Sequence, residues 1–201
     1  AGSFSKGILV NDTKKHLSNV TISDTVIESW YYGIDLEYCS GCTVKNSVVK
    51  DNSIYGIWLF QGSANTIKNN IIARNPHSIF LWSNGNFIRD NGIYDSLFYG
   101  INSLSEHNII TGNFIIGNGR GVHTNDQPNV YVDNLFINHN DNFENWSQPG
   151  SNDFNLTIPA AGTNIIEGSR IGGNYWGFPK NNSGYSQTCP DTDNDGICDT
   201  P

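Results

Sequence analysis

Apolar and polar residues alternate in short blocks along this chain, and the blocks recur at a nearly constant interval. The segment from Asn19 to Asn140 repeats one pattern six times: NVTISDTVIES, CTVKNSVVKDN, NTIKNNIIARN, NFIRDNGIYDS, NIITGNFIIGN and NVYVDNLFINHN. One apolar position recurs every 21 to 23 residues, at Ile22, Val44, Ile67, Ile88, Ile110 and Val132. A period of this size is typical of a solenoid, in which each repeat forms one coil.

Each repeat contains three short apolar segments. The second segment centres five residues after the first, at Ile27, Val49, Ile72, Ile93, Ile115 and Ile137. The third segment follows a small residue, as in Tyr55–Leu59 (YGIWL). Asn is the commonest residue, with 29 copies beside 21 Gly, and both favour turns over helix interiors. The pattern predicts an all-β fold, a right-handed parallel β-helix of about seven coils with three strands in each.

A polar column accompanies the apolar ones. Three residues after the second apolar centre, successive coils place Asn52, Asn75, Ser96, Asn118 and Asn140, and the first coil places Trp30. Stacked amide side chains can hydrogen-bond to one another along such a column. We therefore predict an Asn ladder formed by Asn52, Asn75, Asn118 and Asn140. A set of separate turn residues is the alternative.

The repeat becomes irregular after Asn140. Two apolar segments, 154–158 and 163–166, suggest a last irregular coil, and the segment GGNYWG at 172–177 supplies aromatic residues to cover the end of the tube. We expect the β-helix and this cap to occupy residues 1–178, and an acidic, disulfide-stapled tail to occupy 179–201.

The tail resembles a calcium-binding loop. Its carboxylates stand at alternate positions with a glycine at the sixth, as in the first part of such a loop. The predicted ligands are Asp191, Asp193, Asp195 and Asp199. A solvated acidic tail is the alternative, although close carboxylates repel one another without a cation.

Four cysteines form two close pairs, Cys39 with Cys42 and Cys189 with Cys198. We predict a disulfide in each pair, which implies an oxidising compartment and a secreted or cell-surface protein. A redox-active C-x-x-C is the alternative for the first pair, but such a motif usually opens a helix. Sequons for N-glycosylation fit the same location and occur at Asn11, Asn19, Asn145, Asn155 and Asn181.

The charge and hydropathy of the chain exclude two classes of partner. The net charge is −8 with only 11 basic residues, which argues against nucleic acid. No apolar stretch approaches the roughly 18 residues that span a membrane.

The repeats, the GGNYWG segment and the ending DTDNDGICDTP together resemble the NosD-type parallel β-helix proteins. These are also described as carbohydrate-binding and sugar-hydrolysis domains, and they are common in surface and secreted proteins of methanogenic archaea. The resemblance covers nearly the whole chain and implies the fold rather than one activity. The family name refers to copper, but copper is not expected here, because the chain lacks Met and its histidines lack ligand spacing: His16, His77, His107, His123 and His139.

The third apolar segment carries the candidate binding surface. If its Ile and Leu residues point inward, the alternate residues point outward, and those of two adjacent coils are aromatic: Trp58, Phe60, Phe80 and Trp82. Such a patch marks either a sugar-binding surface or an interface covered by another subunit or by the chain's own C-terminal segment. A one-residue error in register would instead turn these residues inward.

The candidates for catalysis are fewer. Asp35 and Glu37 lie on the same face, and glycoside hydrolysis needs two neighbouring carboxylates. His123 with Asp126 is a weaker acid–base pair. Solvated surface acids are the alternative for all of them.

These features favour a structural or adhesive building block of a cell-surface layer, sheath or filament. No capping helix precedes the first repeat, so an exposed strand edge would favour stacking of one copy on another. The alternative is a carbohydrate-binding or polysaccharide-cleaving module of a larger secreted protein. An enzymatic role is the less favoured of these expectations.

Overall fold

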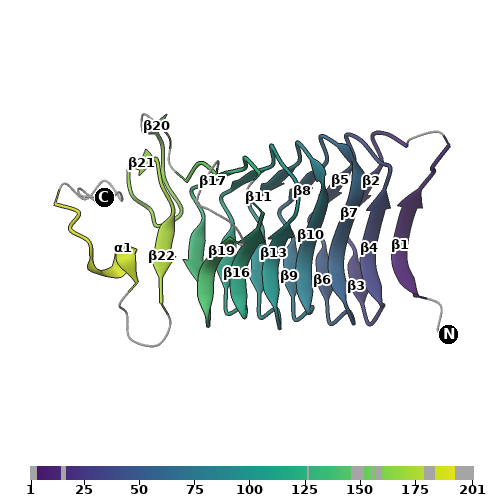
Figure 1. Cartoon of the computed structure of the whole chain (residues 1–201), viewed down its shortest axis with the longest axis horizontal. Coiled ribbons are helices and arrows are strands. Elements are labelled where there is room, and N and C mark those ends of the chain that lie inside the picture. Colours follow the sequence, from purple (N-terminus) through teal and green to yellow (C-terminus); the bar gives the residue numbers. More distant parts are fainter. Residues whose placement is uncertain are drawn as a thin grey trace.

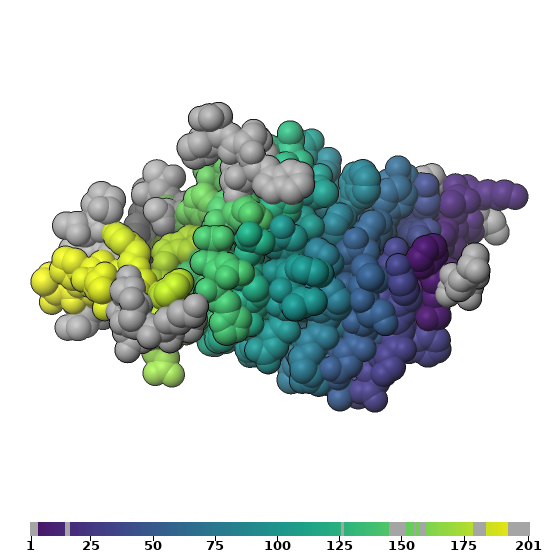
Figure 2. Space-filling model, turned by 60° about the horizontal axis from the view of Figure 1, so that its bottom comes forward, coloured from purple at the N-terminus to yellow at the C-terminus, as the bar shows by residue number. Residues whose placement is uncertain are grey.

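The computed structural model describes residues 4–14, 17–125, 127–145, 152–154, 156, 160–178 and 184–192. The strands wind into an elongated tube, and the chain advances along its long axis from one end to the other (Figures 1 and 2). The predicted right-handed parallel β-helix is therefore confirmed. It contains six complete three-stranded coils, slightly fewer than predicted, with β1 preceding the first and β22 following the last.

Three parallel sheets form the walls of the tube. Sheet 1 has the longest strands and contains β1 (Lys6–Asn11), β4 (Tyr32–Glu37), β7 (Tyr55–Ser63), β10 (His77–Asn84), β13 (Tyr99–Ser103), β16 (Arg120–Thr124) and β19 (Asp141–Asn145). Its strands lie side by side on the near face of the tube in Figure 1. Their length makes sheet 1 the broadest outer surface of the molecule.

The other two sheets are made of three-residue strands. Sheet 2 contains β2 (Thr21–Ser23), β5 (Thr43–Lys45), β8 (Thr66–Lys68), β11 (Phe87–Arg89), β14 (Ile109–Thr111) and β17 (Val130–Val132). Sheet 3 contains β3 (Val26–Glu28), β6 (Val48–Lys50), β9 (Ile71–Ala73), β12 (Gly92–Tyr94), β15 (Phe114–Ile116), β18 (Leu135–Ile137) and β22 (Tyr175–Gly177). A small antiparallel pair, β20 (Ala160–Ala161) with β21 (Arg170–Ile171), and the short helix α1 (Tyr185–Thr188) follow the coils.

Apolar side chains at matching positions fill the tube. Ile22, Val44, Ile67, Ile88 and Ile110 stack in register in sheet 2, and all are buried. In the last coil the prediction was wrong by one residue. Tyr131, not Val132, pairs with Ile110, and Phe136, not Ile137, pairs with Ile115. Each pair of neighbours consists of two hydrophobic residues, so the alternation of apolar and polar positions could not show which one points inward. In both pairs the larger aromatic ring lies in the core.

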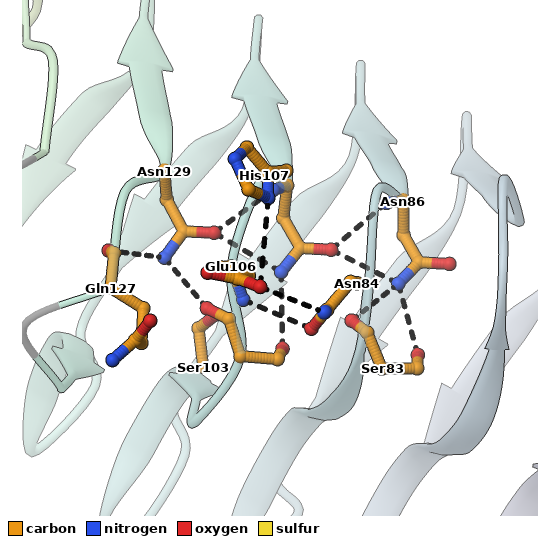
Figure 3. Close-up of polar contacts among 10 residues, drawn as sticks. Ser83, Asn84, Asn86, Ser103, Glu106, His107, Gln127 and Asn129 are labelled. Atoms are coloured by element: carbon orange, nitrogen blue, oxygen red, sulfur yellow. Dashed lines mark hydrogen bonds and ion pairs between the residues drawn. The ribbon is translucent and has the colours of Figure 1, made fainter.

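Three Asn ladders, rather than one, run along the corners of the tube. The first contains Asn65, Asn86, Asn108, Asn129 and Asn152, and Figure 3 shows part of it. The second contains Asn70, Asn91, Asn113, Asn134 and Asn174. The third contains Asn52 and Asn75 and, after an interruption at Ser96, Asn118, Asn138 and Asn142.

Each ladder amide satisfies backbone groups as well as its neighbour. Asn91 Nδ2 donates to Asn113 Oδ1 at 3.0 Å and to the Ile67 carbonyl at 2.9 Å, while the Asn91 backbone N–H donates to Asn113 Oδ1 at 3.0 Å. The predicted ladder position at Asn140 was wrong. Its side chain is exposed, and Asn138 accepts from Asn118 instead. The core residue of this strand is Phe136 rather than the predicted Ile137, so a position counted from Ile137 falls too late in the turn.

An aromatic cluster closes the C-terminal end of the tube. The Trp176 ring stacks on Phe136 with centroids 4.6 Å apart, and Phe154 packs edge-on against Trp176. Phe154 also stacks on Tyr131, whose larger ring lies in the core of the last coil. The predicted covering of this end by the GGNYWG segment is thus observed for its tryptophan.

Candidate functional site

The outer face of sheet 1 carries three rows of large side chains in register. The first row contains Lys6, Tyr32, Tyr55, His77, Tyr99, Arg120 and Asp141. The second contains Leu9, Asp35, Trp58, Phe80, Asn102, His123 and Glu144. The third contains Asn11, Glu37, Phe60 and Trp82.

Trp58, Phe60, Phe80 and Trp82 lie together in the middle of this face, and we call them the aromatic shelf. Trp58 stacks on Phe80 with centroids 4.6 Å apart and planes at 14°, and Phe60 meets Trp82 edge-on at 5.7 Å. The intervening Ile57, Leu59, Ile79 and Leu81 are fully buried, so the predicted register is correct. Trp82 is 51% exposed, so part of the shelf is open to solvent.

A row of tyrosines extends the shelf along one side. Tyr32 stacks parallel to Trp58 at 5.8 Å, and Tyr55 contacts both Trp58 at 4.7 Å and Phe80 at 5.1 Å. These tyrosines are not among the site residues predicted from the sequence. The signal was present, since a tyrosine precedes the glycine of the third segment at Tyr32, Tyr55 and Tyr99.

The shelf ends in an ion cluster toward the N-terminus. Lys6 Nζ lies 2.5 Å from Asp35 Oδ2 and 3.0 Å from Glu37 Oε1, so one ammonium bridges the two predicted catalytic carboxylates. Asn11 also donates to Glu37. Asp35 is fully buried, and its Oδ1 has no hydrogen-bond partner among the described residues.

Burial is the main reason that the pKa of Asp35 is raised to about 6, and the nearby Glu37 adds to the effect, while Lys6 opposes it. The structure therefore brings Asp35 and Glu37 together, as predicted. It places them beneath a lysine rather than in an open cleft.

A second polar cluster lies at the opposite end of the shelf. His123 Nδ1 is 3.0 Å from Asn102 Oδ1, and the His123 ring stacks on Tyr99 at 4.9 Å. Arg120 contacts Glu144 at 3.2 Å and Asp141 at 3.4 Å. Burial lowers the pKa of His123, so the neutral imidazole is favoured. Asp126, its predicted partner, lies outside the described residues.

The remaining predicted sites are only partly described. Cys39 and Cys42 form the predicted disulfide and are buried. Cys189 is disulfide-bonded, but Cys198 and the carboxylates of Asp193, Asp195 and Asp199 lie outside the described residues, so the calcium site stays a prediction. Asn11 and Asn19 are exposed, and the side chain of Asn145 and the residues Asn155 and Asn181 are not described.

The sequence matches the family described as periplasmic copper-binding protein (NosD) over residues 5–181. The chain belongs to the NosD family. No curated protein matches it. Within the described part of this NosD-family chain, no helix has the length and hydropathy needed to span a bilayer.

The donor set of this NosD-family chain does not fit copper in its described part. No three His, Cys, Asp or Glu side chains converge there. His77 is flanked by Tyr55 and Phe98, and burial lowers its pKa to about 4. The chain also has no Met. The expectation that it does not bind copper stays a prediction.

Two solved tailspike structures are similar in fold. One is full-length tailspike protein 2 of an Escherichia coli O157:H7 bacteriophage, with a TM-score of 0.55, 17% identity, and coverage of 87% of this chain and 31% of that one. The other is the enzymatically active domain of bacteriophage CBA120 tailspike protein 2, with a TM-score of 0.51, 16% identity, and coverage of 86% and 34%. The chain thus spans about a third of each, and the likeness concerns the β-helix alone.

Proposed function

We propose that this NosD-family β-helix binds a polysaccharide on the outer face of sheet 1. The observation that carries the proposal is the aromatic shelf, in which Trp82 is half exposed and Trp58 and Phe60 are partly exposed around the buried Phe80. A pyranose ring presents an apolar C–H face that packs on aromatic rings. An exposed aromatic patch of this kind on a polar protein marks a binding surface.

The two ends of the shelf supply polar partners for sugar hydroxyl groups. Glu37 and Asn11 lie at one end, and the partly exposed Arg120 and Glu144 lie at the other. Strands follow one another at about 4.8 Å along the tube, which is close to the length of one sugar unit. A linear glycan lying along the tube axis would therefore meet one strand of sheet 1 per sugar unit.

Binding is better supported than cleavage. A glycosidase needs one carboxyl group that reaches the glycosidic oxygen and a second across the bond. Asp35 is fully buried and Lys6 bridges it to Glu37, so both predicted catalytic groups are engaged within the protein. Release of sugar products that Asp35→Asn abolishes would establish an enzyme and contradict this assignment.

The test of binding uses Trp82→Ala and Trp58→Ala with a panel of bacterial and archaeal surface polysaccharides. Leu97→Ala is the matched control, since Leu97 is 68% exposed and lies outside sheet 1. We expect saturable binding by the wild type and the control, and a loss of about tenfold or more in each tryptophan variant. Unchanged affinity in both tryptophan variants would refute the proposed surface.

A structural or adhesive role is the second candidate. Strand β1 pairs with β4, and its other edge has no partner strand among the described residues. Such an edge can pair with a strand of another copy or of a preceding segment of a longer chain. Electron microscopy of the purified protein with and without Ca²⁺ tests this role, and dispersed single particles under both conditions would argue against it.

Location outside the cytoplasm belongs to the same proposal. The family description is of a periplasmic protein, and the disulfide between the buried Cys39 and Cys42 is consistent with an oxidising compartment. Mass spectrometry of the protein isolated from its source would test this by detecting glycans at the exposed Asn11 and Asn19.

A further inference from the structure

Two neighbouring coils present the same four-residue pattern on sheet 2, away from the aromatic shelf. The segments are Thr43–Asn46 (TVKN) and Thr66–Asn69 (TIKN). Their strands β5 and β8 pair in parallel, with Lys45 opposite Lys68. The apolar residue between threonine and lysine is fully buried in both segments, so the threonine and lysine side chains face outward.

The outward column on sheet 2 brings like charges together. Lys45, Lys68 and Arg89 stand opposite one another on three consecutive strands, about 4.8 Å apart per strand. Like charges directly opposite on paired strands are destabilising. Arg89 contacts Asp90 at 2.7 Å, but Lys45 and Lys68 form no ion pair in the described part of the chain.

Several other cations of the protein form ion pairs with nearby acids. Acidic side chains lie within 3.4 Å of four of them, namely Lys6, Lys50, Arg74 and Arg120. The net charge of −8 offers many acids, yet neither stacked lysine forms an ion pair in the described part of the chain, although Asp24 lies near Lys45. Folding alone gives no reason for this arrangement, because a neutral residue at either position would remove the repulsion.

The neighbours of the two lysines are neutral groups that can donate hydrogen bonds. Threonine hydroxyls flank them on one side, and the turn amides of Asn46 and Asn69 flank them on the other. The Asn46 amide donates one of its two hydrogens to Asp24 Oδ1 at 3.3 Å. Acids occupy the equivalent turn position in the two flanking coils, at Asp24 and Asp90, and again in the last coil, at Asp133. The two coils therefore form one positively charged patch bounded by carboxylates.

We propose that this patch, made by Thr43, Lys45, Asn46, Thr66, Lys68 and Asn69, binds a linear polyuronate. An extended polyuronate carries one carboxylate per sugar, at a spacing similar to the strand repeat of about 4.8 Å. Carboxylates of adjacent sugars can thus each meet one ammonium group, and hydroxyl groups can meet the threonines and asparagines. The proposal does not rest on the aromatic shelf, which lies on another sheet.

The experiment compares the double variant Lys45→Gln/Lys68→Gln with the control Lys14→Gln/Lys50→Gln, which changes the net charge equally at other positions. The probes are an oligogalacturonate and its fully methyl-esterified form, measured by calorimetry at low and high salt. We expect wild type and control to bind only the charged oligomer, with weaker binding at high salt. The patch variant should lose about tenfold in affinity.

Three outcomes would overturn the proposal. They are unchanged affinity in the patch variant with a native circular dichroism spectrum, equal binding of the esterified oligomer, and binding of inorganic phosphate as tightly as of the oligomer. Trp82→Ala should bind the oligogalacturonate like the wild type, so this site and the aromatic shelf are tested separately.

Discussion

The indole ring of Trp176 lies face to face with the Phe136 ring, with centroids 4.6 Å apart and planes at 10°. This contact joins the segment after the coils to the last coil, since β22 pairs with β18 at the same position. Phe136 lies beneath Trp176 and is fully buried. The contact therefore protects the end of the core from water.

We expect Trp176→Ala to lower the free energy of unfolding by about 3 kcal/mol, because a large aromatic contact over the core is lost. Trp176→Phe should recover most of this loss. Urea denaturation followed by circular dichroism measures both. Trp82→Ala is the control for removing a tryptophan, and a loss equal to that of Trp176→Ala would show that the aromatic cluster does not stabilise the tube.

We expect the removal of a single amide from the second ladder to lower the free energy of unfolding substantially. Asn91→Ala removes the acceptor of the Asn70 backbone N–H and the donor to the Ile67 carbonyl, and both of these residues are buried. Buried groups without partners should lower the unfolding free energy on the order of 3 kcal/mol.

Asn140→Ala is the matched control for the ladder, because this amide is exposed. It should change stability by less than about 0.5 kcal/mol. A comparable loss in both variants, measured by the same denaturation, would contradict the ladder assignment of Asn138 in place of Asn140.

Asp35 predicts a decline in stability with rising pH. Burial raises the pKa of the folded-state carboxyl to about 6 from 3.8, so the folded protein binds a proton that the unfolded chain has released between these values. The contribution of Asp35 to the free energy of unfolding is therefore most favourable below about pH 4, and it is lost as the pH rises to about 6.

Asp35→Asn should flatten this part of the stability profile, measured as urea midpoints across the same pH range. Asp95→Asn removes one exposed carboxylate and should keep the wild-type slope between those values. Lys6→Met should raise the pKa of Asp35 further, since the ammonium favours the ionised form. A wild-type profile that is unchanged in Asp35→Asn would refute the assignment.

Gly56, near the start of β7, lies where the structure leaves no room for a side chain. A Cβ atom there would lie 2.6 Å from the Ser78 carbonyl oxygen and 2.8 Å from Asn75 Nδ2. Gly56→Ala should destabilise the protein by about 2 kcal/mol, because backbone of the next coil must move. Leu97→Ala, at an exposed position, should be nearly neutral in the same thermal unfolding experiment.

The acidic tail predicts binding of Ca²⁺. Isothermal titration should detect one site in the wild type and a loss of at least about tenfold in affinity in Asp193→Asn/Asp195→Asn, because two carboxylate ligands are weakened. Asp90→Asn/Asp95→Asn is the control for the change in charge. Equal calcium affinity in both double variants would remove the proposed site.

The sequence by itself determined the coil. A period near 22 residues can bury its apolar columns only by stacking, so the three strands, the inward Ile and Leu columns and the outward aromatic shelf followed from spacing alone. The same spacing indicated an Asn column at one corner. The two further ladders also have a sequence signal, because an asparagine directly precedes Thr66, Ile71 and the equivalent residues of the later coils. A local pattern does not show which of these amides hydrogen-bond to one another.

The tertiary structure decided which residue of two apolar neighbours enters the core and which outward groups meet one another. Tyr131 and Phe136 occupy the core positions predicted for Val132 and Ile137, and their larger rings stack on Phe154 and Trp176 at the end of the tube. Lys6 of β1 contacts Asp35 and Glu37 of the neighbouring strand β4. In the same way Tyr32 of β4 packs on Trp58 of β7, and Tyr55 of β7 packs on Phe80 of β10. Such contacts depend on how successive coils are aligned, and that alignment is set by packing throughout the tube rather than by any one repeat.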